Sequence, residues 1–278
     1  MKGTGTGHGA VTVINAMPCG IGATAGVELE VMAEFSDTGT GRKVTVVNDL
    51  AEDTRMAELC VSSAFRCAGV PEPKNWNLSV TSEIPISRGL KSSSSACNTI
   101  LSAVFDALGT HMGEMDMIRL GVDCARRAGV TVTGSFDDAC GCQLGGLVMT
   151  DNRKDEILLR QNVPDLDVLI YCPEKKIRKK GLPLEKLHAL ADKMENVISL
   201  MPQDPWNAMT CNGRMISSAS NVDNSMAEAA LEAGALGAGM SGSGPAVAMV
   251  FRKGEAETFM SSCDTDMMIL THTRGTHI

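Results

Sequence analysis

The chain has 278 residues and a formal net charge of −8, so no dominant basic surface is expected and nucleic acid is excluded as its main partner. Hydrophobic residues make up 44% and charged residues 21%, which is typical of a soluble globular protein with a sizeable core. No window reaches the roughly 18 uncharged apolar residues that a membrane span needs. Ten scattered cysteines without zinc-type spacing indicate free thiols in a reducing compartment, so we expect a cytoplasmic protein.

The first part of the chain is predicted to be rich in strands. Residues 10–16 (AVTVINA) carry many β-branched side chains and precede a glycine-rich turn. Residues 27–35 alternate apolar and acidic side chains, which is the period-two pattern of a half-exposed strand. Residues 43–47 follow as its expected partner, with residues 38–41 (TGTG) as the hairpin connection.

Helical patterns come next. Apolar residues at helical spacing predict an amphipathic helix over residues 53–68. Residues 78–84 form a strand that stops at a proline, and helices follow over residues 92–108 and 115–128. The last of these ends at Gly129, because glycine readily adopts the left-handed conformation of a helix C-terminus.

The remaining elements mix strands and helices without a strict βαβ order. Expected strands are residues 143–150, 167–171, 246–251 and 267–271, and expected helices are residues 184–201, 225–235 and 255–263. This mixture predicts an α+β fold. A polar run at residues 150–160 predicts a boundary between a first domain, residues 1–152, and a second domain, residues 153–278.

A serine-rich segment lies where the helix over residues 92–108 begins. Gly89 permits a tight turn, and Ser92 to Ser95 offer hydroxyl and amide groups at a helix N-terminus, which attracts phosphate. A serine hydroxyl at this place also reaches a magnesium ion that bridges phosphates. The alternative is a surface helix with ordinary serine N-caps. The one basic cluster, residues 175–180, is either a solvated loop or helix start or a contact with substrate or phosphate.

The spacing of this segment excludes a Walker P-loop. It resembles instead the second motif, PxxxGLGSSSA, of the kinase superfamily that includes galactokinase, homoserine kinase, mevalonate kinase and phosphomevalonate kinase (the GHMP kinases). The resemblance implies ATP as phosphoryl donor, with Mg²⁺ bound near Ser94. The residues expected to contact the nucleotide are Pro85, Ile86, Ser87, Arg88, Gly89, Leu90, Lys91, Ser92, Ser93, Ser94, Ser95 and Ala96.

A glycine-rich segment, residues 237–246 (GAGMSGSGPA), is similar to the third motif of the same superfamily. Glycines at this density let the backbone pass close to phosphates or to a neighbouring loop, although a turn of this kind is often only structural. Two superfamily motifs in the right order are rare by chance. The resemblance adds further nucleotide contacts at Gly239, Ser241, Gly242, Ser243 and Gly244.

Two adjacent aspartates lie in a third segment, residues 130–146 (VTVTGSFDDACGCQLGG). Acidic residues in a glycine-containing loop are otherwise common turn formers. In the superfamily a carboxylate at this place lies near the acceptor hydroxyl, so the resemblance makes Asp137 or Asp138 the catalytic base. Asp137 is preferred, and the two differ only by one position of register.

Within the superfamily, residues 12–31, 128–148 and 232–251 look most like the archaeal-type shikimate kinases. The resemblance implies a half similar to ribosomal protein S5 domain 2, a ferredoxin-like half, a homodimer, and phosphorylation of the shikimate 3-hydroxyl. Homoserine, mevalonate and pantoate kinases remain alternatives, as does a nucleotide-binding relative without catalysis. Acceptor carboxylate binding is open among Arg88, Arg126, Arg178 and Arg274.

The sequence also departs from the superfamily pattern. Lys91 stands where glycine is usual, and Ile21 lies in a turn where relatives are expected to carry lysine. A second magnesium carboxylate should precede the aspartate loop by one helical turn, where Arg126 and Arg127 lie instead. Asp123 is the nearest acid and therefore the candidate ligand, against the alternative of an exposed charge on a helix face.

Overall fold

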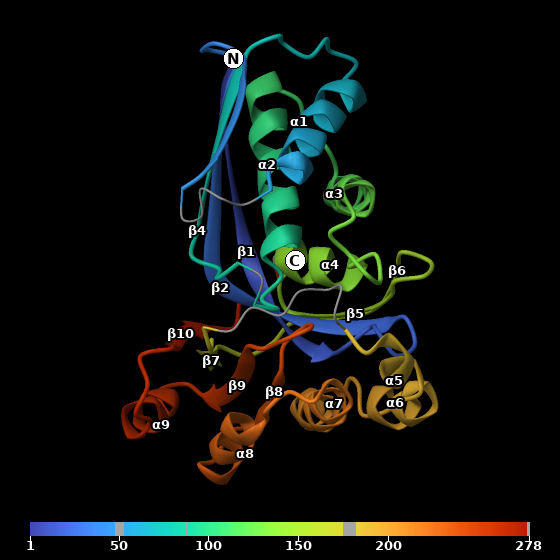
Figure 1. The fold of residues 1–278 in the computed structure, drawn as a ribbon, viewed down its shortest axis with the longest axis vertical. Helices are drawn as coiled ribbons and strands as arrows, with labels where there is room; N and C mark the ends of the chain where they lie inside the picture. Colours follow the sequence, from blue (N-terminus) through green and yellow to red (C-terminus); the bar gives the residue numbers. More distant parts are fainter. Residues whose placement is uncertain (48–52, 87, 175–181, 277–278) are drawn as a thin grey trace.

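The computed structural model describes residues 1–47, 53–86, 88–174 and 182–276. Two sheets are stacked one above the other, and helices cover the first sheet on one face and the second sheet below it (Figure 1). The strands are β1 (Lys2–Ile14), β2 (Ile21–Ser36), β3 (Arg42–Val46), β4 (Trp76–Ser82), β5 (Leu147–Asp151), β6 (Glu156–Gln161), β7 (Leu166–Tyr171), β8 (Gly237–Met240), β9 (Val247–Arg252) and β10 (Met268–His272). The helices are α1 (Arg55–Cys67), α2 (Ser92–Leu108), α3 (Glu114–Ala128), α4 (Phe136–Leu144), α5 (Leu184–His188), α6 (Ala191–Ile198), α7 (Pro205–Ser220), α8 (Ser225–Glu232) and α9 (Ala256–Ser262).

The first sheet is organised around the long strand β2. Strand β1 pairs with it antiparallel along one edge, from Lys2 opposite Ser36 to Ile14 opposite Ala23. On the other edge, β4 pairs with the second half of β2 and β5 with its first half, both antiparallel. Strand β3 lies outside β4 and runs parallel to it, and β6 lies outside β5. The outermost strands of this order, β3 and β6, therefore come from distant parts of the chain. Helix α2 packs against β1, β2 and β4 of this sheet.

Glycines in β1 let helix α2 approach the strand backbone directly. A Cβ atom on Gly3, Gly5 or Gly7 would overlap with atoms of α2, such as the carbonyl oxygen of Thr99 beside Gly5. The intervening Thr4 and Thr6 are exposed, so the glycines face the helix and the threonines face solvent. Residues 2–9 carry little intrinsic strand preference, which is why the sequence predicts a strand only from residue 10.

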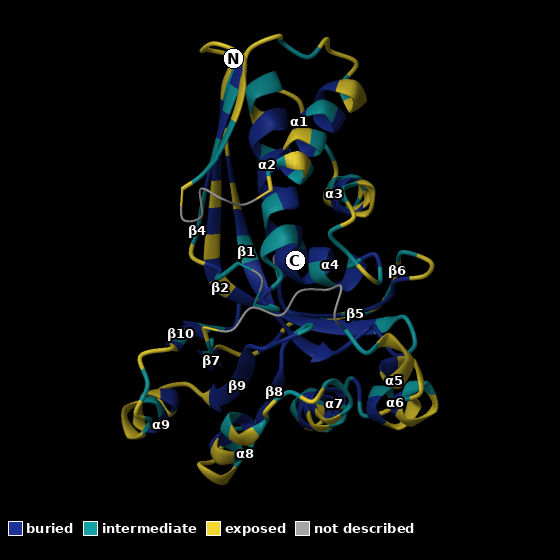
Figure 2. Cartoon of the chain, viewed as in Figure 1, coloured by how far each residue is buried: buried dark blue, intermediate teal, exposed yellow. Residues whose placement is uncertain are grey.

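The second sheet has the order β10-β7-β9-β8, with all neighbours antiparallel. Helices α5 to α9 lie beneath it (Figure 1), and Figure 2 shows β8 and β9 in the colour of buried residues between these helices and the first sheet. Strand β6 belongs to the first sheet and β7 to the second, so the chain changes sheet between Gln161 and Leu166. The division at residue 152 stays a prediction.

Most predicted elements are present, and the α+β class is confirmed. The hairpin prediction is wrong, because β4 inserts between β2 and β3, and β3 pairs with β4 in parallel. Residues 136–144, expected as loop and strand, form α4, and the single helix expected over residues 184–201 is broken into α5 and α6. Helix α7 and strands β6 and β8 have no counterpart among the predictions. No helix in the described ranges is long and apolar enough to cross a membrane.

Candidate active site

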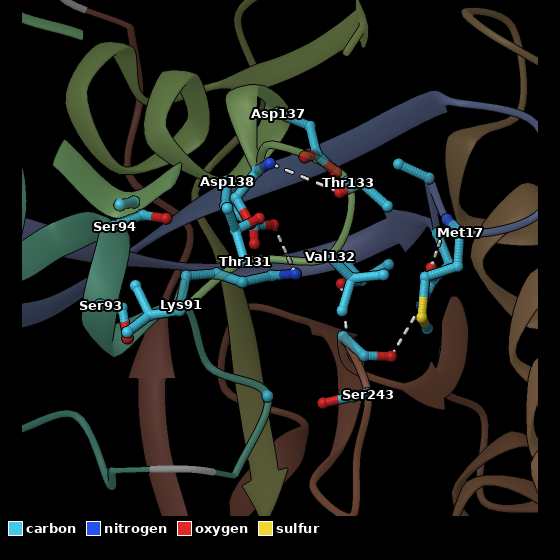
Figure 3. Close-up of a pocket in the computed structure, with 18 of the residues that line it drawn as sticks. Met17, Lys91, Ser93, Ser94, Thr131, Val132, Thr133, Asp137, Asp138 and Ser243 are labelled. Atoms are coloured by element: carbon cyan, nitrogen blue, oxygen red, sulfur yellow. Dashed lines mark hydrogen bonds and ion pairs between the residues drawn. The ribbon is translucent and has the colours of Figure 1, made fainter. Parts of the chain in front are cut away.

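A cavity of about 300 Å³ lies where the N-termini of α2 and α4 meet the turn after β1 (Figure 3). Ser92, Ser93 and Ser94 form the first turn of α2 and line this cavity. Lys91 precedes them in the left-handed conformation, with φ of 65°. The free amide groups at a helix N-terminus carry partial positive charge, so this end of the cavity is suited to bind an anion.

The two glycine-containing motifs lie against each other at the cavity floor. The hydroxyl of Ser241 donates to the carbonyl oxygen of Gly89 over 2.9 Å and accepts from the amide of Thr12 over 3.1 Å. The amide of Gly242 donates to the Thr12 hydroxyl over 2.8 Å. Gly89 has φ of 88°, and a Cβ atom on it would overlap with the carbonyl oxygen of Ser241. This close approach of two backbones explains why glycine stands at both positions 89 and 242.

Asp137 lies in the first turn of α4 on the opposite wall and is only 4% exposed. The Asn152 side chain donates to its Oδ1 over 2.7 Å and accepts from its backbone amide over 2.9 Å. Its Oδ2 lies so close to Gly22 of β2 that a side chain there would overlap with it. Burial raises the pKa of Asp137 to about 7, and the neighbouring Asp138 carboxylate adds to this, while Lys91 and Asn152 oppose it.

Asp138 is held differently, by an ion pair. The Lys91 ammonium lies 2.6 Å from Oδ1 of Asp138, and the two side chains are 5% and 19% exposed. Burial alone would lower the pKa of Lys91, but the carboxylates of Asp138 and Asp137 outweigh it and raise this pKa above its ordinary value. The cavity therefore holds a cation and two carboxylates between two helix N-termini, which is an arrangement suited to aligning a phosphate with an alcohol.

Family models match the chain in both halves. The GHMP kinases N terminal domain matches residues 54–146, and the GHMP kinases C terminal domain matches residues 189–266. The chain is a GHMP kinase.

Its similarity to two archaeal shikimate kinases extends over nearly all of its length. The chain is 35% identical to the shikimate kinase of Methanosarcina acetivorans over 267 residues, which cover 95% of this chain and 90% of that protein. It is 37% identical to that of Methanothrix thermoacetophila over 255 residues, covering 89% of this chain and 85% of that protein. The protein thus belongs to the shikimate kinase branch of the GHMP kinases.

The fold is shared with a solved structure. The mevalonate kinase of Methanococcus jannaschii superposes with a TM-score of 0.81, covering 100% of this chain and 98% of that one at 13% identity. At this identity the likeness shows the fold alone. The expected GHMP kinase fold is confirmed.

The structure of this GHMP kinase brings together part of the predicted site. Of the motif residues, those that line the cavity with Asp137 and Asp138 are Gly89, Lys91, Ser92, Ser93, Ser94, Gly242 and Ser243. Ile86 and Ala96 line a smaller neighbouring cavity instead. Ser87 lies outside the described residues, and so does the basic segment at 175–180, which includes Arg178. Leu182, which is described, lines the cavity.

Other predicted contacts lie elsewhere in the fold. Leu90 and Ser95 are buried, and Ser95 lies beside Gly7 of β1. Gly239 packs against Gly213 of α7, where a Cβ atom would come within 2.8 Å of the Gly213 Cα. Ser241 is fully buried and supports the cavity floor through the bonds described above, and Gly244 donates to its carbonyl. Pro85 is not among the residues that line either described cavity.

Asp123 is not brought to the site. It lies on an exposed face of α3, where Arg127 is 3.4 Å away and the Asp123 side chain is 54% exposed. Arg126 forms two hydrogen bonds to Asp155, at 2.7 and 2.8 Å. Both arginines that depart from the superfamily pattern are thus engaged by acidic partners and leave the cavity uncrowded.

The remaining arginine candidates also have partners away from the cavity. Arg88 donates to the carbonyl oxygen of Pro173, and its own carbonyl accepts from Ala246. Arg274 is 5% exposed and donates to the carbonyl oxygen of Cys142 over 2.6 Å. Among the lining residues that the structure describes, the cation is Lys91.

Sequence reasoning missed several residues that shape the cavity. Thr12 and Asn15 come from the end of β1, and the Asn15 side chain donates to the carbonyl oxygen of Gly242 over 2.7 Å. Asn152 orients Asp137 from the polar run that the sequence indicates only as a domain boundary. The available signal is an asparagine directly after a buried strand. Gly22 belongs to the predicted turn, but its role depends on a pairing of distant strands.

The described residues fit a magnesium ion that is held mainly by its nucleotide. No group of three or more His, Cys, Asp or Glu side chains in the described ranges is arranged to hold a metal by itself. The Ser94 hydroxyl and the Asp138 carboxylate face the same cavity (Figure 3). Mg²⁺ prefers oxygen ligands and commonly takes one or two from protein and the rest from phosphates and water.

Proposed function

We propose that this protein is a shikimate kinase, which transfers the γ-phosphoryl group of ATP to the 3-hydroxyl of shikimate. The support is the whole-length similarity to archaeal shikimate kinases combined with the geometry of one cavity. The observation that carries the proposal is that the α2 N-terminus and the buried Asp137 carboxylate face each other across that cavity (Figure 3). A phosphate bound at the first wall would meet an alcohol bound at the second.

On the donor side, the phosphates of ATP lie at the first turn of α2. Ser92 and Ser93 line both the main cavity and a neighbouring cavity of about 90 Å³. That smaller cavity is walled by apolar side chains such as Met56, Val80 and Ile100. A nucleotide with its phosphates at the serines places its base there. Ser94, in the first turn of α2, would hold a Mg²⁺ ion together with the phosphates, and the ion would neutralise part of the phosphate charge.

On the acceptor side, the cavity offers groups that suit a polyhydroxylated substrate. Thr131 and Thr133, in the connection between α3 and α4, line the same cavity as Asp137. Asp137 orients the acceptor hydroxyl and accepts its proton, since a carboxylate with a pKa of about 7 is a competent base near neutral pH. Phosphoryl transfer depends mainly on alignment and charge stabilisation, so the pre-organised carboxylate and helix ends supply most of what is needed.

A substrate panel tests this function. Purified protein with Mg²⁺ and ATP is incubated in parallel with shikimate, homoserine, mevalonate and pantoate, and ADP release and the phosphorylated product are measured. Shikimate should support turnover at least about a hundredfold faster than the others, because the acceptor must fill hydrogen bonds that an unrelated alcohol leaves unpaired. If another acceptor is phosphorylated faster than shikimate, that acceptor is the substrate and the proposal of shikimate is wrong. Nucleotide binding without transfer to any acceptor would favour a non-catalytic relative.

The proposal includes a homodimer and a cytoplasmic location. The first follows from the resemblance and is measured by light scattering of the purified protein. The second follows from the sequence, in which ten scattered cysteines indicate free thiols in a reducing compartment. Cell fractionation checks it.

A further inference from the structure

Lys91 occupies a backbone position that is unfavourable for it. Its φ of 65° lies in the left-handed region, which strains a residue with a Cβ atom, whereas glycine adopts it freely. Non-glycine residues persist in this conformation where the surrounding structure fixes them, and such positions cluster at functional sites. Ser135, at the start of α4 on the opposite wall, is a second case, with φ of 52°. Both residues line the same cavity.

The side chain of Lys91 crosses from one wall of the cavity to the other. Its backbone belongs to the α2 N-terminus, and its ammonium lies 2.6 Å from Asp138 in the first turn of α4 (Figure 3). With 5% of the side chain exposed, the ammonium is removed from bulk water, where an ion pair is little screened. Asp138 therefore fixes the position of a cation at the place where the two helix ends meet.

The two neighbouring carboxylates have separate partners. Asp137 is held by the Asn152 amide and lies against Gly22, whereas Asp138 is held by Lys91. A triphosphate brought to the α2 N-terminus adds several negative charges beside these two acids. Like charges that share one small cavity of low dielectric constant repel each other strongly. The Lys91 ammonium is the cation among the described lining residues that offsets this repulsion.

We propose that Lys91 is a catalytic residue whose ammonium contacts the γ-phosphoryl group during transfer, and that Asp138 is the positioning residue that holds it there. This inference rests on the proposed kinase function and assigns separate roles to the two aspartates. In the step, the acceptor oxygen forms a bond to the γ-phosphorus while the bond from that phosphorus to the β–γ bridging oxygen breaks. The acceptor proton passes to Asp137, ADP leaves with the bond electrons, and Lys91 remains protonated throughout.

The first test measures nucleotide binding without turnover. Calorimetry compares ADP with AMP-PNP, a non-hydrolysable analogue of ATP, in the presence of Mg²⁺ for the wild type, Lys91→Met and Lys91→Gly. Both variants should lose about tenfold in affinity for AMP-PNP and change by less than twofold for ADP, because only AMP-PNP carries a γ-phosphate. Lys91→Met keeps the volume of the buried stem, and Lys91→Gly keeps the left-handed backbone without strain. An equal loss for both nucleotides, or no loss, would overturn the inference.

The second test asks whether Asp138 acts through Lys91. The kcat of Lys91→Met, Asp138→Asn and the double variant is measured with shikimate. Each single change should lower kcat at least tenfold, and Asp138→Asn should add less than threefold in the Lys91→Met background. Asp138→Asn should also leave the affinity for ADP within twofold of wild type. Losses that multiply in the double variant would show that the two residues act independently, and the assignment of Asp138 would be wrong.

The outcome for Lys91 is separable from that for the proposed function. A wild-type protein that binds AMP-PNP but does not phosphorylate shikimate would refute the function, while the comparison of ADP with AMP-PNP would still decide the role of Lys91. Conversely, a wild type that phosphorylates shikimate, with Lys91 variants that bind both nucleotides normally, would leave the function intact and refute the role of Lys91.

Discussion

The Ser241 hydroxyl donates a 2.9 Å hydrogen bond to the carbonyl oxygen of Gly89 and so joins two motifs that lie 152 residues apart in the chain. The same hydroxyl accepts from the amide of Thr12. One buried side chain thereby fixes the turn before α2, the end of β1 and the loop after β8 relative to one another. The site is assembled across both sheets, and the glycine-rich loop supports the serine-rich one.

Replacing Ser241 with alanine should destabilise the protein and loosen the nucleotide site together. The Thr12 amide and the Gly89 carbonyl would lose a partner in a buried place, which costs about 1–3 kcal/mol per unsatisfied group. We therefore expect chemical denaturation to show a loss of that size, and the Kd for AMP-PNP to rise about tenfold. Ser243→Ala is the matched control, because Ser243 lines the cavity two residues away. If the control loses as much stability as Ser241→Ala, the joint between the motifs is not the cause.

Much of the fold is predictable because its elements follow local rules. Helix α2 spans Ser92–Leu108, the range that the sequence predicts, and α3 ends at Gly129 in the left-handed conformation. Pairing between distant segments carries no such local signal. Nothing in residues 38–47 indicates that β4, some 30 residues later, inserts beside β2 and takes β3 as a parallel neighbour.

In the candidate site, too, some residues are predictable from local sequence and others depend on contacts between distant segments. The serine run and the two aspartates are recognisable as motifs, so their meeting in one cavity follows from the resemblance. The residues that hold them in place are not. Asn152 reaches Asp137 only because β5 ends beside α4, and the Lys91–Asp138 pair exists only because two helix N-termini converge. Such contacts depend on tertiary packing, which a single sequence does not specify locally.

The glycines of β1 offer a test of the packing that positions α2. Alanine at position 5 would place a methyl group against the Thr99 carbonyl and the Ala103 amide, both of which are helix backbone and cannot move aside. We expect Gly5→Ala to lower the free energy of unfolding by about 3 kcal/mol, at the upper end for overpacking. Thr6→Ala, on the exposed face of the same strand, should cost less than about 1 kcal/mol. Equal effects in urea denaturation would contradict the direct contact.

The raised pKa of Asp137, about 7, predicts how the reaction depends on pH. The carboxylate accepts a proton only when it is ionised, so kcat should fall about tenfold per pH unit below 7 and level off above it. Asp137→Asn should lower kcat by about 10²–10⁴-fold with the Kd for AMP-PNP changed little. Asp138→Asn should retain an inflection but move it below pH 7, because the Asp138 carboxylate helps to raise the pKa of Asp137. An inflection that is lost in Asp138→Asn and kept in Asp137→Asn would exchange the two assignments.

The same pKa has a consequence for stability. Because burial raises the pKa of Asp137 above its unfolded value, the unfolded chain releases this proton more readily, and the group destabilises the fold increasingly as pH rises from about 4 to about 7. Each pKa unit between the two states is worth about 1.4 kcal/mol. Asp137→Asn should therefore be more stable than wild type at pH 8, with the difference shrinking toward pH 4. Thermal melts at both pH values measure it, and a variant that is less stable at pH 8 contradicts the buried-carboxylate explanation.

Gly22 allows the position of Asp137 to be tested without removing its charge. A methyl group at position 22 would overlap with Oδ2 of Asp137, and the carboxylate would have to turn away from the acceptor and from Asn152. We expect Gly22→Ala to lower kcat by about 10²-fold, since a displacement of about 1 Å is sufficient for such a loss, while the Kd for AMP-PNP stays within twofold. Gly26→Ala is the control, because a methyl group on this other residue of β2 would press on the Gly145 backbone instead. That control should lose stability but retain kcat within threefold, and if the two variants lose kcat equally, the carboxylate does not need the space that Gly22 leaves for it.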